Sequence, residues 1–255
     1  MDFNQNRQNF SEYTVLDSKP ASGEGAVAKK FMANVFLWMF IALGISAFMA
    51  YTFANNQSLI DMLYVQTTRG VGLSGMGYLI AFAPIGFVLL MSFGFARLSA
   101  PVITLLFIAF SAIMGMSLSV VLLTYTAGSV LGCFASASAM FGVMAVMGYT
   151  TEKDLTSFGR LLTMGLIGIV IASLINMFIG SSSMDLIISI IGVAVFTGLT
   201  AYDVQKLKRI GAGMEFEGVS TGDSSKFAIM GAMSLYLDFI NLFLMLLRLF
   251  GNRRD

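Results

Sequence analysis

The chain has 255 residues, of which 57% are hydrophobic and only 11% are charged, and its formal net charge is +1. A water-soluble domain needs a more charged surface, so this composition indicates an integral membrane protein and gives no sign of a nucleic acid partner. The chain has no histidine and a single cysteine, Cys133, which excludes histidine-based metal or acid–base sites and an intramolecular disulfide.

Continuous apolar runs of about 20 residues predict transmembrane helices rather than the alternating strands of a barrel. Residues 1–28 are polar and rich in Asn, Gln, Ser and Gly, so we expect a disordered cytosolic tail before a single membrane domain over 29–255. Loops are expected at 55–72 and, as the longest polar connection, at 210–226. The seven expected spans of this all-α, polytopic fold are 31–54, 73–96, 102–123, 129–149, 160–179, 186–203 and 227–250.

The fourth expected span carries small residues at a regular interval. Gly128, Gly132 and Ser136 are four residues apart and therefore share one helical face. Such a ridge is typical of helices that pack closely in membranes. The sequence therefore predicts close helix packing along this face.

The distribution of basic residues predicts the orientation. If the N-terminus is cytosolic, 11 of the 15 Lys and Arg residues fall on the cytosolic side and four on the other. This is the asymmetry that the positive-inside rule describes. The basic segment 248–254 disagrees with seven full crossings, so a half-inserted or re-entrant last segment remains an alternative.

An acidic residue, Asp238, lies inside the last apolar run, where it costs about 2.5–3.5 kcal/mol on insertion scales. Ser234, Asp238, Asn241 and Arg248 follow one another at steps that place them on one helical face. Lipid disfavours such a face, so we expect it to point toward other helices or water. The expected sixth and fifth spans carry their own polar stripes, formed by Thr197, Thr200 and Asp203 and by Ser173 and Asn176.

Asp203 and Asp238 together are a candidate pH sensor. Two carboxylates close together in a low-dielectric site cannot both ionise easily, so we expect them to share a proton. Carboxylate oxygens also suit Ca²⁺ better than soft metals. Asp203 lies only about 5 Å from the basic end of its span, whereas Asp238 lies about 18 Å from Lys226. The pair therefore forms only if the last span begins in the cytosol or water enters the bundle, and otherwise Asp203 is an ordinary interfacial charge.

The residues around both aspartates resemble the bacterial branch of the Bax inhibitor-1 family, also called the transmembrane Bax inhibitor motif family. The resemblance extends from about Lys29 to the C-terminus. It rests on Ala201-Tyr-Asp-Val-Gln-Lys-Leu-Lys208, on the segment 234–251, on Gly148-Tyr-Thr-Thr-Glu-Lys-Asp-Leu155 and on Phe196-Thr-Gly-Leu-Thr200.

The resemblance implies a seven-helix fold, with the last helix central and two three-helix layers around it. It also implies a non-enzymatic, pH-sensitive calcium leak of the bacterial inner membrane, without a cofactor other than a permeant or weakly bound calcium ion. In such a protein Asp203 and Asp238 would share a proton and contact the ion, and Arg97 would latch the closed pore. The expected pore-lining side chains are Thr197, Thr200, Ser234, Asn241 and Asn176.

Two other functions fit parts of the sequence. An intramembrane aspartyl protease also places aspartates on helices six and seven, and Tyr202-Asp203 fits that pattern. However, Asp238 follows Leu235-Tyr-Leu237 where such proteases have Gly-x-Gly-Asp, and the Pro-Ala-Leu element is missing. The third function is a regulator that binds another membrane protein, such as a quality-control protease. Calcium flux in liposomes that contain only this protein separates the three.

Overall fold

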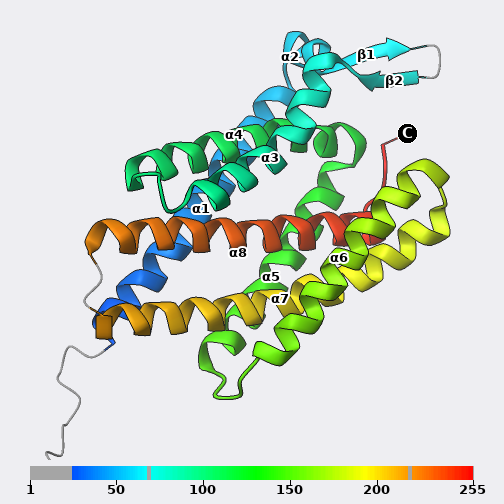
Figure 1. The fold of residues 1–255 in the computed structure, drawn as a ribbon. Helices are drawn as coiled ribbons and strands as arrows, with labels where there is room; N and C mark the ends of the chain where they lie inside the picture. The colour runs from blue at the N-terminus through cyan, green and yellow to red at the C-terminus, as the bar shows by residue number, and fades with distance from the viewer. Residues whose placement is uncertain (1–24, 68–69, 218–219, 255) are drawn as a thin grey trace, which may run out of the picture.

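Seven helices of the protein are long and apolar enough to cross a membrane in the computed structural model, which describes residues 25–67, 70–217 and 220–254 (Figure 1). The all-α, polytopic fold predicted from the composition is therefore confirmed. Residues 1–24 of the expected tail lie outside the described residues, and the first helix already begins at Ala26. The seven helices are α1 (Ala26–Ala54), α3 (Gly75–Gly94), α4 (Ala100–Thr124), α5 (Ala127–Thr150), α6 (Thr156–Ile179), α7 (Ser182–Glu217) and α8 (Thr221–Phe250).

Helix α8 lies at the centre, between two groups of three helices. Helix α4 packs against α1 and α3 in one group, helix α7 packs against α5 and α6 in the other, and α8 contacts members of both (Figure 1). In an apolar stretch of 18 residues, 72% of the residues are buried in α8, whereas 11% are buried in α6. This difference explains why the polar stripe of α8 is tolerated, since protein rather than lipid surrounds it.

Helix α7 is much longer than the sequence suggested. The expected loop at 210–226 is wrong, because α7 continues to Glu217 and α8 begins at Thr221. The basic residues from Lys206 to Arg209 were interpreted as a boundary, but long basic side chains can extend to water from a continuing helix. The extension packs on the start of α1, where Gly211 lies against Phe31 and Ala28.

The described parts of the connection between α1 and α3, residues 55–67 and 70–74, contain regular structure, although a loop was expected there. It contains the short helix α2 (Gln57–Leu63) and an antiparallel pair of strands, β1 (Tyr64–Thr67) and β2 (Gly70–Leu73), with Tyr64 opposite Leu73. Leu63 is 2% exposed and packs with Phe53 and Ile80, so a small second core holds this segment onto the bundle.

Close helix packing on α5 occurs at a glycine that the sequence analysis did not single out. The predicted ridge is wrong, because a Cβ added to Gly128 or Gly132 would meet no atom within 4 Å. A Cβ at Gly148 would instead lie only 2.2 Å from the backbone oxygen of Ala201 on α7. This contact fixes the separation of α5 and α7 two residues before Asp203.

The segment after α8 is attached to the turn between α4 and α5. The amide of Thr126 donates to the carbonyl of Asn252 at 3.0 Å, and the amide of Arg254 donates to the carbonyl of Thr124 at 2.8 Å. Helix α8 therefore traverses the bundle, from its connection with α7 to the opposite end. The last segment is one continuous helix over Thr221–Phe250, so it is not re-entrant.

Candidate functional site

The antiparallel packing of α7 and α8 brings the two predicted aspartates together. Asp203 lies 14 residues before the end of α7, and Ser234 lies 13 residues after the start of α8. The two positions are therefore at one level, and the Ser234 hydroxyl donates a hydrogen bond to the Asp203 carboxylate. The depth mismatch noted in the sequence disappears because both helices extend well beyond this level.

Asp238 lies one helical turn further along α8. It is only 7% exposed, and one of its oxygens has no hydrogen-bond partner among the described residues. Asp203 is close enough to act on it electrostatically. The buried hydroxyl of Thr197 on α7 likewise has no partner within the described part of the chain. Two buried oxygens are therefore left to accept a hydrogen bond or contact a cation, and of the two only the Asp238 carboxylate can take up a proton.

A cavity of about 340 Å³ opens beside Asp203, between α3, α7 and α8. We call it the Asp203 cavity. Its polar lining consists of Asp203, Ser234, Lys206 and Ser92. The positive charge of Lys206 interacts electrostatically with the Asp203 carboxylate. The sequence analysis counted Lys206 only as an orientation charge, although its spacing of three residues from Asp203 placed both on one helical face.

Arg97 does not contact the pair in this arrangement. It follows the end of α3, its side chain is exposed, and among the described residues it forms no ion pair. Helix α3 instead presents Ser92 and Val88 to the Asp203 cavity. The latch role of Arg97 stays a prediction.

The expected pore-lining residues are divided between two places. Thr200 is fully buried and its hydroxyl donates to the carbonyl of Phe196 at 2.9 Å, so its hydrogen-bonding need is already met within α7. Asn241 and Asn176 line a second cavity of about 530 Å³ between α6, α7 and α8. We call this the Asn241 cavity. It lies toward the other end of α8, beyond Asp238.

The aspartate pair offers few ligands for a tightly held metal ion. No group of three or more acidic or cysteine side chains suited to a metal occurs within residues 25–67, 70–217 and 220–254. Calcium usually takes six to eight oxygen ligands. An ion at the pair would therefore keep much of its water, which suits transient contact during passage.

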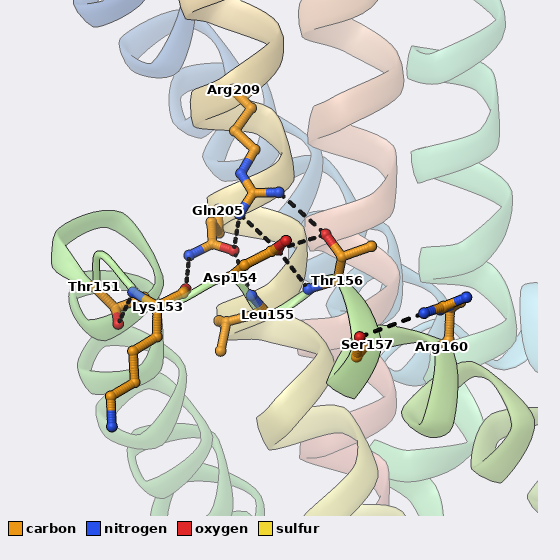
Figure 2. Close-up of polar contacts among 9 residues, drawn as sticks. All are labelled: Thr151, Lys153, Asp154, Leu155, Thr156, Ser157, Arg160, Gln205 and Arg209. Carbon is orange, nitrogen blue, oxygen red and sulfur yellow. Dashed lines mark hydrogen bonds and ion pairs between the residues drawn. The ribbon is translucent and has the colours of Figure 1, made fainter.

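A polar cluster fixes α7 just beyond Asp203 (Figure 2). The side-chain oxygen of Gln205 accepts from the amide of Leu155 at 2.9 Å, and its side-chain amide donates to the carbonyl of Lys153 at 2.7 Å. Arg209 pairs with Asp154 at 2.7 Å. These contacts attach the α5–α6 connection to α7, and no local sequence pattern indicates them because the partners are about 50 positions apart.

The same cluster keeps Asp154 ionised. The hydroxyl and the amide of Thr156 both donate to the Asp154 carboxylate, and Arg209 adds a third hydrogen bond. These bonds hold the pKa of the Asp154 carboxyl well below its ordinary range. Asp154 therefore does not change its charge near neutral pH.

The opposite side of α8 is held by a buried hydrogen-bond chain. The Ser46 hydroxyl on α1 donates to the carbonyl of Ser111 on α4 at 2.7 Å, which leaves its oxygen to accept from the Tyr236 hydroxyl at 2.7 Å. Tyr236 is fully buried, with its ring against Phe107 and Phe110. This chain fixes the rotation of α8 and so directs its polar stripe toward α7.

Comparison with known proteins agrees with the motifs around both aspartates. The family model described as "Inhibitor of apoptosis-promoting Bax1" matches residues 28–255. The inner membrane protein YbhL of Escherichia coli is 44% identical over 227 residues, which cover 88% of this chain and 92% of the relative. An uncharacterized protein of Rickettsia prowazekii is 40% identical, covering 89% of this chain and 91% of that protein. An uncharacterized membrane protein of Streptococcus pyogenes is 34% identical, with coverages of 87% and 92%. With a match that spans the whole membrane domain, the chain belongs to the Bax inhibitor-1 family.

Proposed function

We propose that the protein is a pH-sensitive calcium leak in which Asp203 and Asp238 control passage. The observation that carries this proposal is the burial of Asp238 at the centre of the bundle, within electrostatic reach of a second carboxylate. Acidic side chains at such positions in membrane proteins are functional sites by default. The hydrogen bond between α7 and α8 from Ser234 to Asp203 supports a pair that acts as one unit.

The proton and the cation compete for the same oxygens. With both carboxylates ionised, the pair attracts a divalent cation but repels itself in a low-dielectric site. One shared proton relieves that repulsion and lowers the attraction for the cation. The leak therefore responds to pH through the charge of the pair. At neutral pH the charged pair holds the Arg97 latch, and when both carboxyls are neutral the pair no longer attracts the cation. Calcium flux therefore peaks at an intermediate pH, with one proton on the pair.

Calcium is the cargo in this proposal, not a resident cofactor. The pair supplies carboxylate oxygens, and the hydroxyl of Ser234 contacts Asp203. Water completes the coordination shell, because calcium prefers six to eight oxygens. Binding of this kind is weak enough to release the ion, which conduction requires.

A peptide-hydrolysing role for the two aspartates has less support. Leu235 and Tyr236, just before Asp238, are both 0% exposed and are packed against neighbouring helices. A protease needs substrate backbone to approach its aspartates, and bulky buried side chains leave no space for that. We therefore propose a non-enzymatic function.

The relative YbhL is described as an inner membrane protein, which supports the same location for this chain. Basic residues gather at the start of α1, at the connection between α5 and α6, and in the last third of α7, namely Lys29, Lys30, Lys153, Lys206, Lys208 and Arg209. We propose that this end of the bundle is cytosolic, in accordance with the positive-inside rule.

Calcium uptake into proteoliposomes tests the function directly. The purified protein is the only protein present, a trapped calcium dye reports entry, and the external pH is varied. We expect wild-type uptake to depend on pH, and expect Asp203→Asn, Asp238→Asn and the double variant to lose that dependence to a similar extent. Asp223→Asn, an exposed acid in the first turn of α8, is the control and should retain it. Uptake no faster than in protein-free liposomes at every pH would overturn the proposal, and additive losses would show that the two aspartates do not act together.

A further inference from the structure

The Asn241 cavity lies on the far side of Asp238 from the Asp203 cavity. Its lining includes Asn241 and Arg248 of α8, Asp185 and Phe196 of α7, and Ser173 and Asn176 of α6. The Asp203 cavity is lined by α7 residues from Asp203 onward and by α8 residues up to Leu237. The two cavities therefore enter the α7–α8 interface from opposite ends of the bundle.

The Asn241 cavity has the side chains of a water-filled space. Asp185 and Arg248 form an ion pair at 3.3 Å, and their side chains are about 40% exposed, so the charged pair stands at an open mouth. Further inside, Asn241 and Asn176 are only partly engaged, the first with the carbonyl of Leu237 and the second with the amide of Ser181. Lipid chains filling this space would leave charged and amide groups without solvation, which is costly.

Little of the protein separates the two cavities. Leu237 lines one and Asn241 lines the other, and the Asn241 side-chain amide donates to the Leu237 carbonyl between them. Four residues of helix rise by about 6 Å. The hydrocarbon core of a bilayer is about 30 Å thick. Asp238, which has one carboxylate oxygen without a hydrogen-bond partner among the described residues, lies within this one turn.

We propose that the Asn241 cavity is an aqueous vestibule, and that it and the Asp203 cavity leave a barrier of one helical turn at Asp238. The vestibule proposal rests on the proposed leak function. It assigns a route to a hydrated divalent cation, which enters at the Asp185–Arg248 mouth, passes Asn176 and Asn241, and reaches Asp238 and then Asp203. Phe196, Leu237 and Asp238 form the barrier. The route passes along the α7 side of α8, whereas the Tyr236–Ser46–Ser111 side stays closed.

Cysteine accessibility to a membrane-impermeant, charged thiol reagent tests the vestibule without measuring any ion flux. The full chain with Cys133→Ser is the background, and reagent is applied to intact cells and, separately, to inside-out membrane vesicles. We expect Asn241→Cys to react from one side only and Ser234→Cys from the other. Gly222→Cys, at the exposed start of α8, marks the side to which the Asp203 cavity opens.

Matched control positions distinguish a water-filled cavity from a lipid-facing surface and from a closely packed interior. Leu242→Cys and Leu235→Cys are each adjacent to a test position but fully buried, so they should react from neither side. Ile171→Cys on α6 is 52% exposed but faces lipid, so it too should remain unreacted. Ser173→Cys is a second probe of the vestibule on another helix, for use if Asn241→Cys does not fold.

The vestibule is overturned if Asn241→Cys and Ser173→Cys react no faster than Leu242→Cys and Ile171→Cys. The one-turn barrier is overturned if Asn241→Cys and Ser234→Cys react from the same side. If both react as expected but proteoliposomes take up no calcium, the vestibule stands and the proposed leak function fails, so the two failures are distinguishable.

Discussion

Replacing Gly148 by alanine should destabilise the protein, because it separates two helices that touch backbone to backbone. The new Cβ would lie 2.2 Å from the Ala201 oxygen and 2.8 Å from its Cα, whereas ordinary contacts begin at 3.4 Å. Helices α5 and α7 must therefore move apart by about 1 Å, and overpacking of this kind typically costs about 1–3 kcal/mol. For a chain of this size each kcal/mol corresponds to about 2–4 °C, so we expect the melting temperature to fall by roughly 2–12 °C.

The measurement is the midpoint of thermal unfolding in detergent, followed by circular dichroism and by the fraction that elutes as a monodisperse peak after heating. Gly142→Ala is the matched control, because Gly142 is on the same helix and a Cβ there meets nothing within 4 Å. That variant should be unchanged or more stable by up to about 1 kcal/mol, the difference in helix propensity. Equal shifts for the two variants would refute the close-approach argument. Because Asp203 follows Ala201 by two residues, Gly148→Ala should also change the pH profile of calcium uptake.

Four other substitutions test the latch, the loop cluster and the hydrogen-bond chain. Arg97→Ala should raise calcium uptake into proteoliposomes at neutral pH, and unchanged uptake at every pH would remove Arg97 from the mechanism. Asp154→Asn should leave the shape of the uptake–pH curve unchanged between neutral and mildly acidic pH. The folded-state pKa of Asp154 is depressed, so its contribution is complete above the ordinary carboxyl pKa and is lost only as pH falls through the lower folded value. Tyr236→Phe should lower the free energy of unfolding by about 0.5–1.5 kcal/mol in a denaturant titration, and Ser46→Ala by more, because it removes both hydrogen bonds and leaves the buried Tyr236 hydroxyl unpaired.

Local patterns in the sequence were sufficient for the transmembrane spans and for the polar face of the last helix. Apolar runs long enough to cross a bilayer identified all seven transmembrane helices, because lipid requires the backbone of each to be satisfied within its own segment. The helical spacing of Ser234, Asp238 and Asn241 placed them on one face, and they do lie along one stripe between the two cavities. Asp203 could be expected beside them only with the help of the family resemblance.

Features that depend on distant partners were not predictable from local patterns. Basic residues in α7 suggest a boundary, but whether the helix continues depends on the surface of α1 that covers Gly211. The clamp of Gln205 on the α5–α6 connection joins segments about 50 residues apart, so no window of sequence contains it. Small-residue spacing is equally ambiguous, since it marked Gly128 and Gly132, which pack on nothing, and missed Gly148.

The central position of α8 has a consequence for how the protein is made. A ribosome delivers helices in chain order, so α1 to α7 enter the membrane before the helix that most of them surround. Until α8 arrives, the two three-helix groups expose to lipid, or to each other, the surfaces that will later hold Tyr236 and Asp238. Helix α8 then inserts between two groups of helices that are already in the membrane. Its insertion must also move the carboxyl group of Asp238 through the hydrocarbon region. Assembly of the bundle is therefore completed only when its last helix is inserted. A chain whose translation stops before α8 lacks the central helix of the bundle rather than a peripheral one.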